Sequence, residues 1–240
     1  MHKAERAIIM AAGLGQRLRP ATDHLPKPMV KVNGKRMIET VIEGLQQNGI
    51  EEIHVATGYH AEAYDLIREK YPKVDFVHNP WYETRNNISS MFVVREYLHN
   101  CICVDGDNLI YHPEILDPHF EYSGYAGIEI HHETAEWLMV TDENRFVQYS
   151  TKGGNTGWQL FGVCHVSEED GQRIRRHLEE EYLIKKNYDI WWDEIALFLY
   201  KDEFRFQVHP IHWGDIQEVD CFSELCELDP SYLTKEADAK

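Results

Sequence analysis

Short apolar runs and helical periodicities alternate along the first half of the chain. Residues 7–12 (AIIMAA) are continuously apolar, which is typical of a buried parallel strand. Apolar residues between Met37 and Leu45 recur at helical spacing, and Gly49 follows them where a helix can end. The same reasoning predicts strands at 53–57, 74–78 and 101–104 and helices at 61–70 and 88–98. This β-α-β alternation predicts a parallel sheet covered by helices.

The pattern changes beyond residue 120, where strands follow one another without long helices between them. Strands are predicted near 124–131, 136–142, 145–150 and 157–166, then helices near 167–182 and 191–200, a strand at 204–211 and a helix after Asp220. We therefore predict one α/β domain over residues 1–233, with a mixed, mostly parallel central sheet, helices on both faces and a small antiparallel extension. Residues 234–240 are predicted to form a disordered tail.

Composition places the chain among ordinary globular proteins. It has 240 residues, of which 43% are hydrophobic and 27% charged. No apolar run approaches the ~20 residues of a transmembrane helix, and the N-terminus lacks the apolar stretch of a signal peptide, so we expect a cytoplasmic protein. Five cysteines occur without a C-x-x-C pair, which favours buried thiols over zinc or disulfides.

The charge balance restricts the partners. The chain carries 24 Lys and Arg against 41 Asp and Glu, giving a formal net charge of −17. Nucleic acids and anionic membranes repel such a surface at long range, so neither is an expected partner. A phosphate compound can still bind, but only at a local basic site.

A local basic site is present in the glycine-containing segment after the first strand. Gly13 and Gly15 would let backbone N–H groups approach a phosphate or a base, and Arg17 and Lys27 add positive charge. Leu18 occupies the third glycine position of a dinucleotide fingerprint, and no G-K-[ST] occurs. From the glycines alone, an ordinary loop would fit equally well.

Acidic residues follow the 101–104 strand and precede the last helix. Asp105 and Asp107 are two residues apart at the carboxyl edge of the predicted sheet, where ligands of open α/β folds bind. Mg²⁺ uses one or two carboxylates together with phosphate oxygens, so these residues suit it. Asp220 comes just before the final helix, and a helix N-cap is its alternative role.

A third group of candidate residues is aromatic and acidic. Asp189 and Asp193 are four residues apart, hence on one face if the segment is helical, and would then need a cation between them. Tryptophan faces attract quaternary ammonium groups, and Trp191 and Trp192 stand between the two aspartates. A single tryptophan most often packs in the core. The residues alone therefore leave open whether these tryptophans pack in the core or bind a quaternary ammonium group.

Taken together, these motifs resemble those of a known enzyme family. G-x-G-x-R-L with P-K-P about ten residues later resembles the signature of nucleotidyltransferases that activate sugar phosphates and small alcohol phosphates. More narrowly, the order and spacing of R-N-N-I-S-S-M, D-G-D-N, E-W-L, Y-D-I-W-W-D and E-V-D resemble bacterial CTP:phosphocholine cytidylyltransferases. The resemblance runs from Ala7 to about Asp229 and implies a Rossmann-like nucleotidyltransferase fold.

The resemblance implies roles for individual residues. Lys27 and Arg17 would be the catalytic residues: Lys27 would neutralise the α-phosphate region, and Arg17 would contact the β and γ phosphates. Asp107 and Asp220 would hold Mg²⁺. The other nucleotide-binding residues would be Ala12, Gly13, Gly15, Asn87, Ser90 and Asp105. The choline head would be surrounded by Trp137, Asp189, Trp192 and Asp193, with Trp191 where a tyrosine is expected.

The implied reaction joins CTP and phosphocholine to give CDP-choline and pyrophosphate. Its rivals are a cytidylyltransferase for phosphoethanolamine or 2-aminoethylphosphonate and a sugar-1-phosphate nucleotidylyltransferase. A noncatalytic nucleotide or quaternary-amine sensor is a further alternative, although mere binding does not need the metal-binding pair. The sequence leaves the oligomeric state open, a homodimer included.

Overall fold

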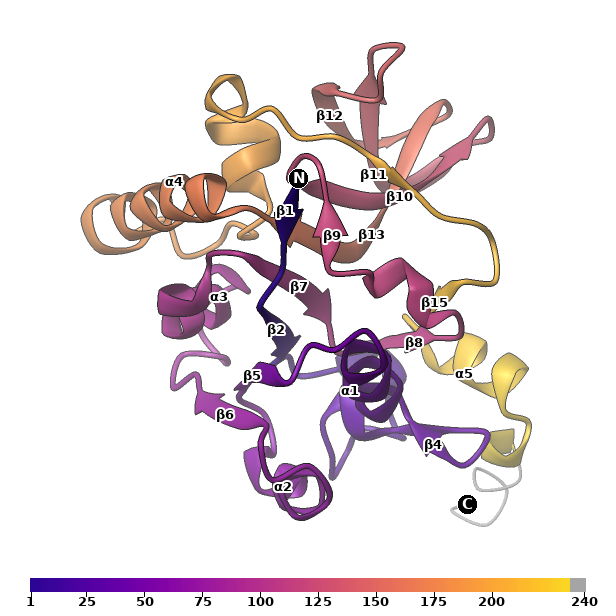
Figure 1. Ribbon diagram of the computed structural model, residues 1–240. Helices are drawn as coiled ribbons and strands as arrows, with labels where there is room; N and C mark the ends of the chain where they lie inside the picture. The colour runs from indigo at the N-terminus through magenta and orange to yellow at the C-terminus, as the bar shows by residue number, and fades with distance from the viewer. Residues whose placement is uncertain (234–240) are drawn as a thin grey trace.

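A computed structural model describes residues 1–233 and contains a central sheet with strand order β12-β11-β13-β7-β2-β5-β6 (Figure 1). The bounds are β12 Val147–Gly154, β11 Thr134–Thr141, β13 Gly157–Val166, β7 Cys101–Asp105, β2 Arg6–Ala11, β5 Glu52–Thr57 and β6 Asp75–His78. The last four strands in this order run parallel, and β13 is antiparallel to β7. Strand β10 (Gly124–Ile130) pairs with β13 and with the short β14 (His209–Pro210). The predicted α/β class with a mixed sheet is thus confirmed.

Helices cover both faces of the parallel strands (Figure 1). Helices α1 (Met37–Gln47) and α2 (Asp65–Lys70) contribute to one core with Ile9 of β2, whereas α3 (Ile88–Val94) and α4 (Glu168–Glu179) contribute to a second core with Ile8. Successive side chains of a strand point to opposite faces. The continuous apolar run of β2 is therefore required, because each of its faces is buried.

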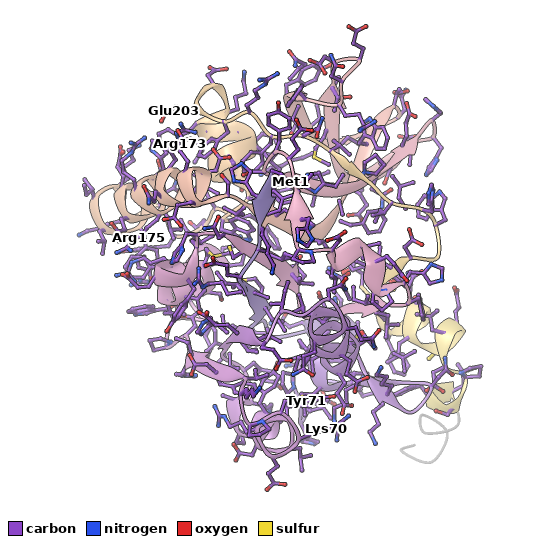
Figure 2. The ribbon with its side chains drawn as sticks, in the orientation of Figure 1. Met1, Lys70, Tyr71, Arg173, Arg175 and Glu203 are labelled. Atoms are coloured by element: carbon purple, nitrogen blue, oxygen red, sulfur yellow. The ribbon has the colours of Figure 1, made fainter. Side chains whose placement is uncertain are left out.

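The ends of α1 follow from its local sequence. Glu39 accepts a hydrogen bond from the backbone N–H of Arg36 at 3.1 Å, which satisfies a donor at the start of the helix. Gly49 follows the last turn with φ +79°, as predicted. Hydrogen bonds join α1 to the end of α2 (Figure 2). The Tyr71 hydroxyl donates to Oε1 of Glu43 at 2.5 Å, and Nζ of Lys70 donates to the same oxygen at 3.1 Å. These contacts anchor α2.

The C-terminal segment returns to the edge of the parallel strands. Strand β15 (Ile216–Glu218) pairs antiparallel with β8 (Asn108–Ile110), and α5 (Phe222–Leu228) follows. The remaining short strands are β1 (His2–Lys3), β9 (His119–Phe120), β3 (Lys31–Val32) and β4 (Lys35–Arg36). The β8–β15 pairing places Asp220 beside the segment that carries Asp107, although these two residues are more than a hundred positions apart in the sequence.

Three predicted elements differ from the structure. The helix predicted at 167–182 is longer, because helical turns extend α4 through 180–185. The helix predicted at 191–200 is shorter, and its helical turns cover only Ile195–Leu199. Within the predicted strand 204–211, only His209 and Pro210 belong to a strand. The predicted tail, 234–240, lies outside the described residues.

The five cysteines are free thiols, and four of them are buried, in agreement with the buried thiols expected from their spacing. Among residues 1–233, no helix is both long enough and apolar enough to cross a membrane.

Candidate active site

A cleft of about 420 Å³ opens at the carboxyl ends of β2 and β7. Ligands of open α/β sheets bind at this edge. Its walls come from the loop after β2, the end of β7, the start of α3 and the junction between β15 and α5. The predicted site residues that line it are Ala12, Gly13, Gly15, Arg17, Lys27, Asn87, Ser90, Asp105, Asp107, Trp191 and Asp220.

The glycine loop folds back against Lys27. Gly15 has φ +60°, and a Cβ added there would lie 3.0 Å from Cβ of Lys27 and 3.2 Å from Cγ2 of Thr22. The Thr22 hydroxyl donates to the Gly15 carbonyl at 2.8 Å and holds the turn. Gly15 is thus needed for both its backbone conformation and the close approach of Lys27.

Lys27 lies between two carboxylates. Its Nζ donates to Oδ2 of Asp107 at 2.5 Å and to Oδ1 of Asp220 at 3.3 Å, and the residue is only 8% exposed. Burial favours the neutral amine, but the nearby carboxylates, Asp107 first, outweigh it and raise the pKa of Lys27 above its usual value. Arg17 donates to the same Oδ1 of Asp220 at 2.5 Å. The cleft therefore holds a fixed positive charge bracketed by acids.

Glu218 is a site residue that the sequence analysis missed. It lies on β15, lines the cleft, and has a pKa raised to about 8 by burial and then by the charges of Asp107 and Asp220. Burial and the charge of Asp107 likewise raise the pKa of Asp105. The spacing of Glu218 and Asp220, two residues apart on an extended segment, was the signal that could have identified Glu218.

The Asp107 and Asp220 carboxylates suit a divalent cation. Each has one oxygen in contact with the same ammonium, so together they already face one cation-sized position. No cluster of three or more Asp, Glu, His or Cys side chains in residues 1–233 is arranged to hold a metal ion. A metal at this position would need further oxygen ligands, which a bound phosphate can supply.

The segment predicted to contact the base is bound to the 188–192 segment. The backbone N–H of Asn86 donates to the Tyr188 carbonyl at 2.9 Å, and that of Trp192 donates to Oδ1 of Asn87 at 2.8 Å. Arg85, a cleft residue missed in the sequence, places its guanidinium 3.9 Å from the centre of the Tyr188 ring. Two distant stretches of sequence thus form one wall.

The tandem tryptophans divide between cleft and core. Trp191 is 46% exposed and lines the cleft, and its ring centre lies 6.4 Å from that of Trp137. Trp192 is 3% exposed and packs in the core beneath the sheet. The structure therefore brings Trp137 beside Trp191, but of the three tryptophans only Trp191 lines the cleft.

The expectation that Asp189 and Asp193 share a helical face is wrong. Residues 188–193 form turns, because Asn86 holds the Tyr188 and Asp189 carbonyls and the helical turns begin only afterwards. Asp189 is exposed, whereas Oδ1 of Asp193 accepts a hydrogen bond from the Tyr125 hydroxyl at 2.9 Å. Burial raises the pKa of Asp193 to about 7. Neither residue lines the cleft, and their choline-binding roles stay predictions.

Comparison with known proteins identifies the family. A family model described as nucleotidyl transferase matches residues 6–119. A 2-aminoethylphosphonate cytidylyltransferase of Lancefieldella rimae is 34% identical over 95% of this chain and 93% of its own length. The chain belongs to the nucleotidyl transferase family. A choline-phosphate cytidylyltransferase of Streptococcus pneumoniae is 32% identical to this nucleotidyltransferase over 93% of the chain and 96% of the relative.

A solved structure supports the same assignment. The CTP:phosphocholine cytidylyltransferase from Streptococcus pneumoniae matches with a TM-score of 0.88 and 31% identity, covering 95% of this nucleotidyltransferase and 98% of that chain. The family model spans the glycine loop, Lys27 and Asp107, and the full-length matches extend to Asp220 and the aromatic residues. The nucleotidyltransferase is therefore an enzyme of the cytidylyltransferase type.

Proposed function

We propose that the enzyme transfers CMP from CTP to phosphocholine, releasing pyrophosphate. The observation that carries this proposal is the exposed Trp191 ring, which lies next to Trp137 and lines the same cleft as Arg17 and Lys27. Tryptophan faces bind trimethylammonium, which offers no N–H donor and is weakly hydrated. The similarity in sequence and in structure to choline-phosphate cytidylyltransferase from Streptococcus pneumoniae supports the same acceptor.

The chemistry requires alignment and charge neutralisation rather than a strong base. A phosphate monoester has a second pKa near 6, so the attacking oxygen of phosphocholine is largely ionised at neutral pH. It forms a bond to the α-phosphorus of CTP as the bond to pyrophosphate breaks. Lys27 would turn its ammonium to the α-phosphate, and Arg17 would hold the β and γ phosphates. Both cations already lie in the cleft.

Asp107 and Asp220 would hold Mg²⁺ in this proposal. When bound, the ion would neutralise phosphate charge and orient the reacting groups. The two carboxylates would then no longer depend on Lys27 as their counter-ion, which leaves the ammonium free for the substrate.

Transfer to 2-aminoethylphosphonate is a second candidate function. It is favoured by the 34% identity to the Lancefieldella rimae enzyme over nearly the whole chain. The burial of Trp192 also favours it, because fewer aromatic faces reach the cleft than the sequence predicted. A primary ammonium binds by hydrogen bonds to acceptors, so it depends less on aromatic faces.

A pyrophosphate-release assay separates the candidates. The enzyme is supplied with CTP, Mg²⁺ and one of phosphocholine, phosphoethanolamine, 2-aminoethylphosphonate or glucose 1-phosphate, and UTP replaces CTP as the control. We expect the highest kcat/KM with CTP and phosphocholine. A higher value with 2-aminoethylphosphonate would establish the second candidate, and a preference for glucose 1-phosphate would overturn both.

A further inference from the structure

A lysine of this chain lies on the aromatic surface proposed for the acceptor. Trp137 of β11 and Lys152 of β12 are directly opposite each other in the antiparallel pair, so their side chains share one face of the sheet. The Lys152 ammonium lies 5.0 Å from the centre of the Trp137 ring and 5.5 Å from that of Phe198. These distances are those of cation–π contacts. The aromatic surface therefore already carries a cation.

Glu194 connects this lysine to the cleft. Its Oε2 lies 3.0 Å from the Lys152 ammonium, and its Oε1 accepts a hydrogen bond from the backbone N–H of Trp191 at 3.1 Å. The Glu194 side chain is only 13% exposed, whereas that of Lys152 is 50% exposed. Lys152 can thus swing into solvent while Glu194 stays in place beside the aromatic rings.

We infer that Lys152 is an internal competitor of the acceptor, a cation that the amine head of the acceptor must displace from the Trp137 face. The inference rests on the proposed function, in which the acceptor carries a cation. A half-exposed lysine in a single ion pair is held weakly, so its displacement is readily reversible. After displacement, Glu194 and the aromatic rings remain to receive the incoming charge.

The exchange has the same cost for every amine. Each acceptor must free the Trp137 face of the same ammonium, so its apparent affinity falls by the same factor. The preference for trimethylammonium comes from the aromatic face itself, because this group is weakly hydrated and covers more of the ring. Lys152 therefore raises the KM of every cationic acceptor by the same factor.

The test compares Lys152→Ala and Lys152→Gln with the wild-type enzyme, using Lys185→Ala as the matched control. Lys185 also lies over an aromatic ring, 5.2 Å from the centre of Tyr200, but it pairs with Glu181 at 2.8 Å, whereas Lys152 pairs with Glu194. KM and kcat are measured for phosphocholine and phosphoethanolamine, together with KM for CTP.

We expect both Lys152 variants to lower KM about fivefold for phosphocholine and by a similar factor for phosphoethanolamine, with little change in kcat or in KM for CTP. Lys185→Ala should change none of these values. An unchanged or raised acceptor KM in the Lys152 variants would overturn the inference, as would a parallel change in KM for CTP.

A binding measurement separates this inference from the proposed function. Tetramethylammonium is titrated into the wild-type enzyme and the Lys152 variants while tryptophan fluorescence is followed. Tighter binding by both variants supports the inference even if no choline compound is turned over, and equal binding overturns it. Absence of pyrophosphate release with any amine acceptor would refute the proposed function alone.

Discussion

Removal of the Lys27 ammonium tests the proposed chemistry most directly. Lys27→Met keeps much of the apolar stem of the side chain but deletes the charge that contacts Asp107 and Asp220. Lys27 is 8% exposed, so its charge acts in surroundings of lower dielectric than water. At an effective dielectric constant of about 20, a unit charge 4 Å away contributes about 4 kcal/mol. Loss of one preorganised group of this kind lowers kcat by about 10² to 10³.

The assay is pyrophosphate release at saturating CTP and phosphocholine, with acceptor KM measured in parallel. We expect kcat to fall by about 10² or more, while KM for phosphocholine changes only a few-fold because Lys27 faces the nucleotide phosphates in our proposal. Lys31→Met is the control, since Lys31 is exposed at the start of β3, four residues after Lys27. A thermal melt establishes that each variant is folded.

An unchanged kcat in a folded Lys27→Met enzyme would refute the assignment of Lys27 to the transition state. A rise in acceptor KM with unchanged kcat would instead place Lys27 at the phosphocholine phosphate. A loss of kcat in Lys31→Met of the same size would show that the loop, rather than the ammonium, is responsible.

Three further predictions concern stability and residue assignment. Gly15→Ala should lower the free energy of unfolding by about 1–3 kcal/mol, and by more than Gly49→Ala in chemical denaturation, because both have positive φ but only Gly15 approaches other side chains. Burial lowers the pKa of His165 from 6.5 to about 3, so its stabilising effect is present above pH 6.5 and is lost as pH falls toward 3. This group alone lowers the free energy of unfolding by about 2 kcal/mol at pH 5 relative to pH 7. In urea titrations, the free energy of unfolding of His165→Gln should therefore fall less steeply with decreasing pH than that of the wild-type protein. Trp192→Ala should destabilise the fold by about 3–5 kcal/mol, whereas Trp191→Ala should chiefly raise acceptor KM; the opposite pattern would return Trp192 to the acceptor site.

The parts of the fold that depend on local sequence could be predicted. Local sequence patterns mark the positions of β2, α1 and the end of β7. Burial on both faces gives β2 a continuous apolar run, α1 has apolar residues at helical spacing, and aspartates stand at the end of β7. The cleft residues that follow β2 and β7 could be predicted because they stand directly after these recognisable strands.

The remaining features depend on contacts between distant segments. Trp191 and Trp192 are adjacent and chemically identical, so only the path of the 188–193 turns decides which ring reaches the cleft. Asn86 and Asn87, about a hundred residues earlier, set that path: Asn86 donates hydrogen bonds to it, and the Asn87 side chain accepts one from Trp192. The spacing of Glu218 and Asp220 could have identified Glu218, but its raised pKa depends on burial and on the charge of the distant Asp107.

The wall formed by segments 85–87 and 188–192 has a consequence for how the two substrates affect each other's binding. The sides of the cleft proposed for the nucleotide and for the amine share one piece of hydrogen-bonded backbone, joined at Asn86 and Asn87. A first substrate that orders this backbone lowers the entropy cost of binding the second. Thermodynamic linkage then requires each substrate to tighten the binding of the other by the same factor.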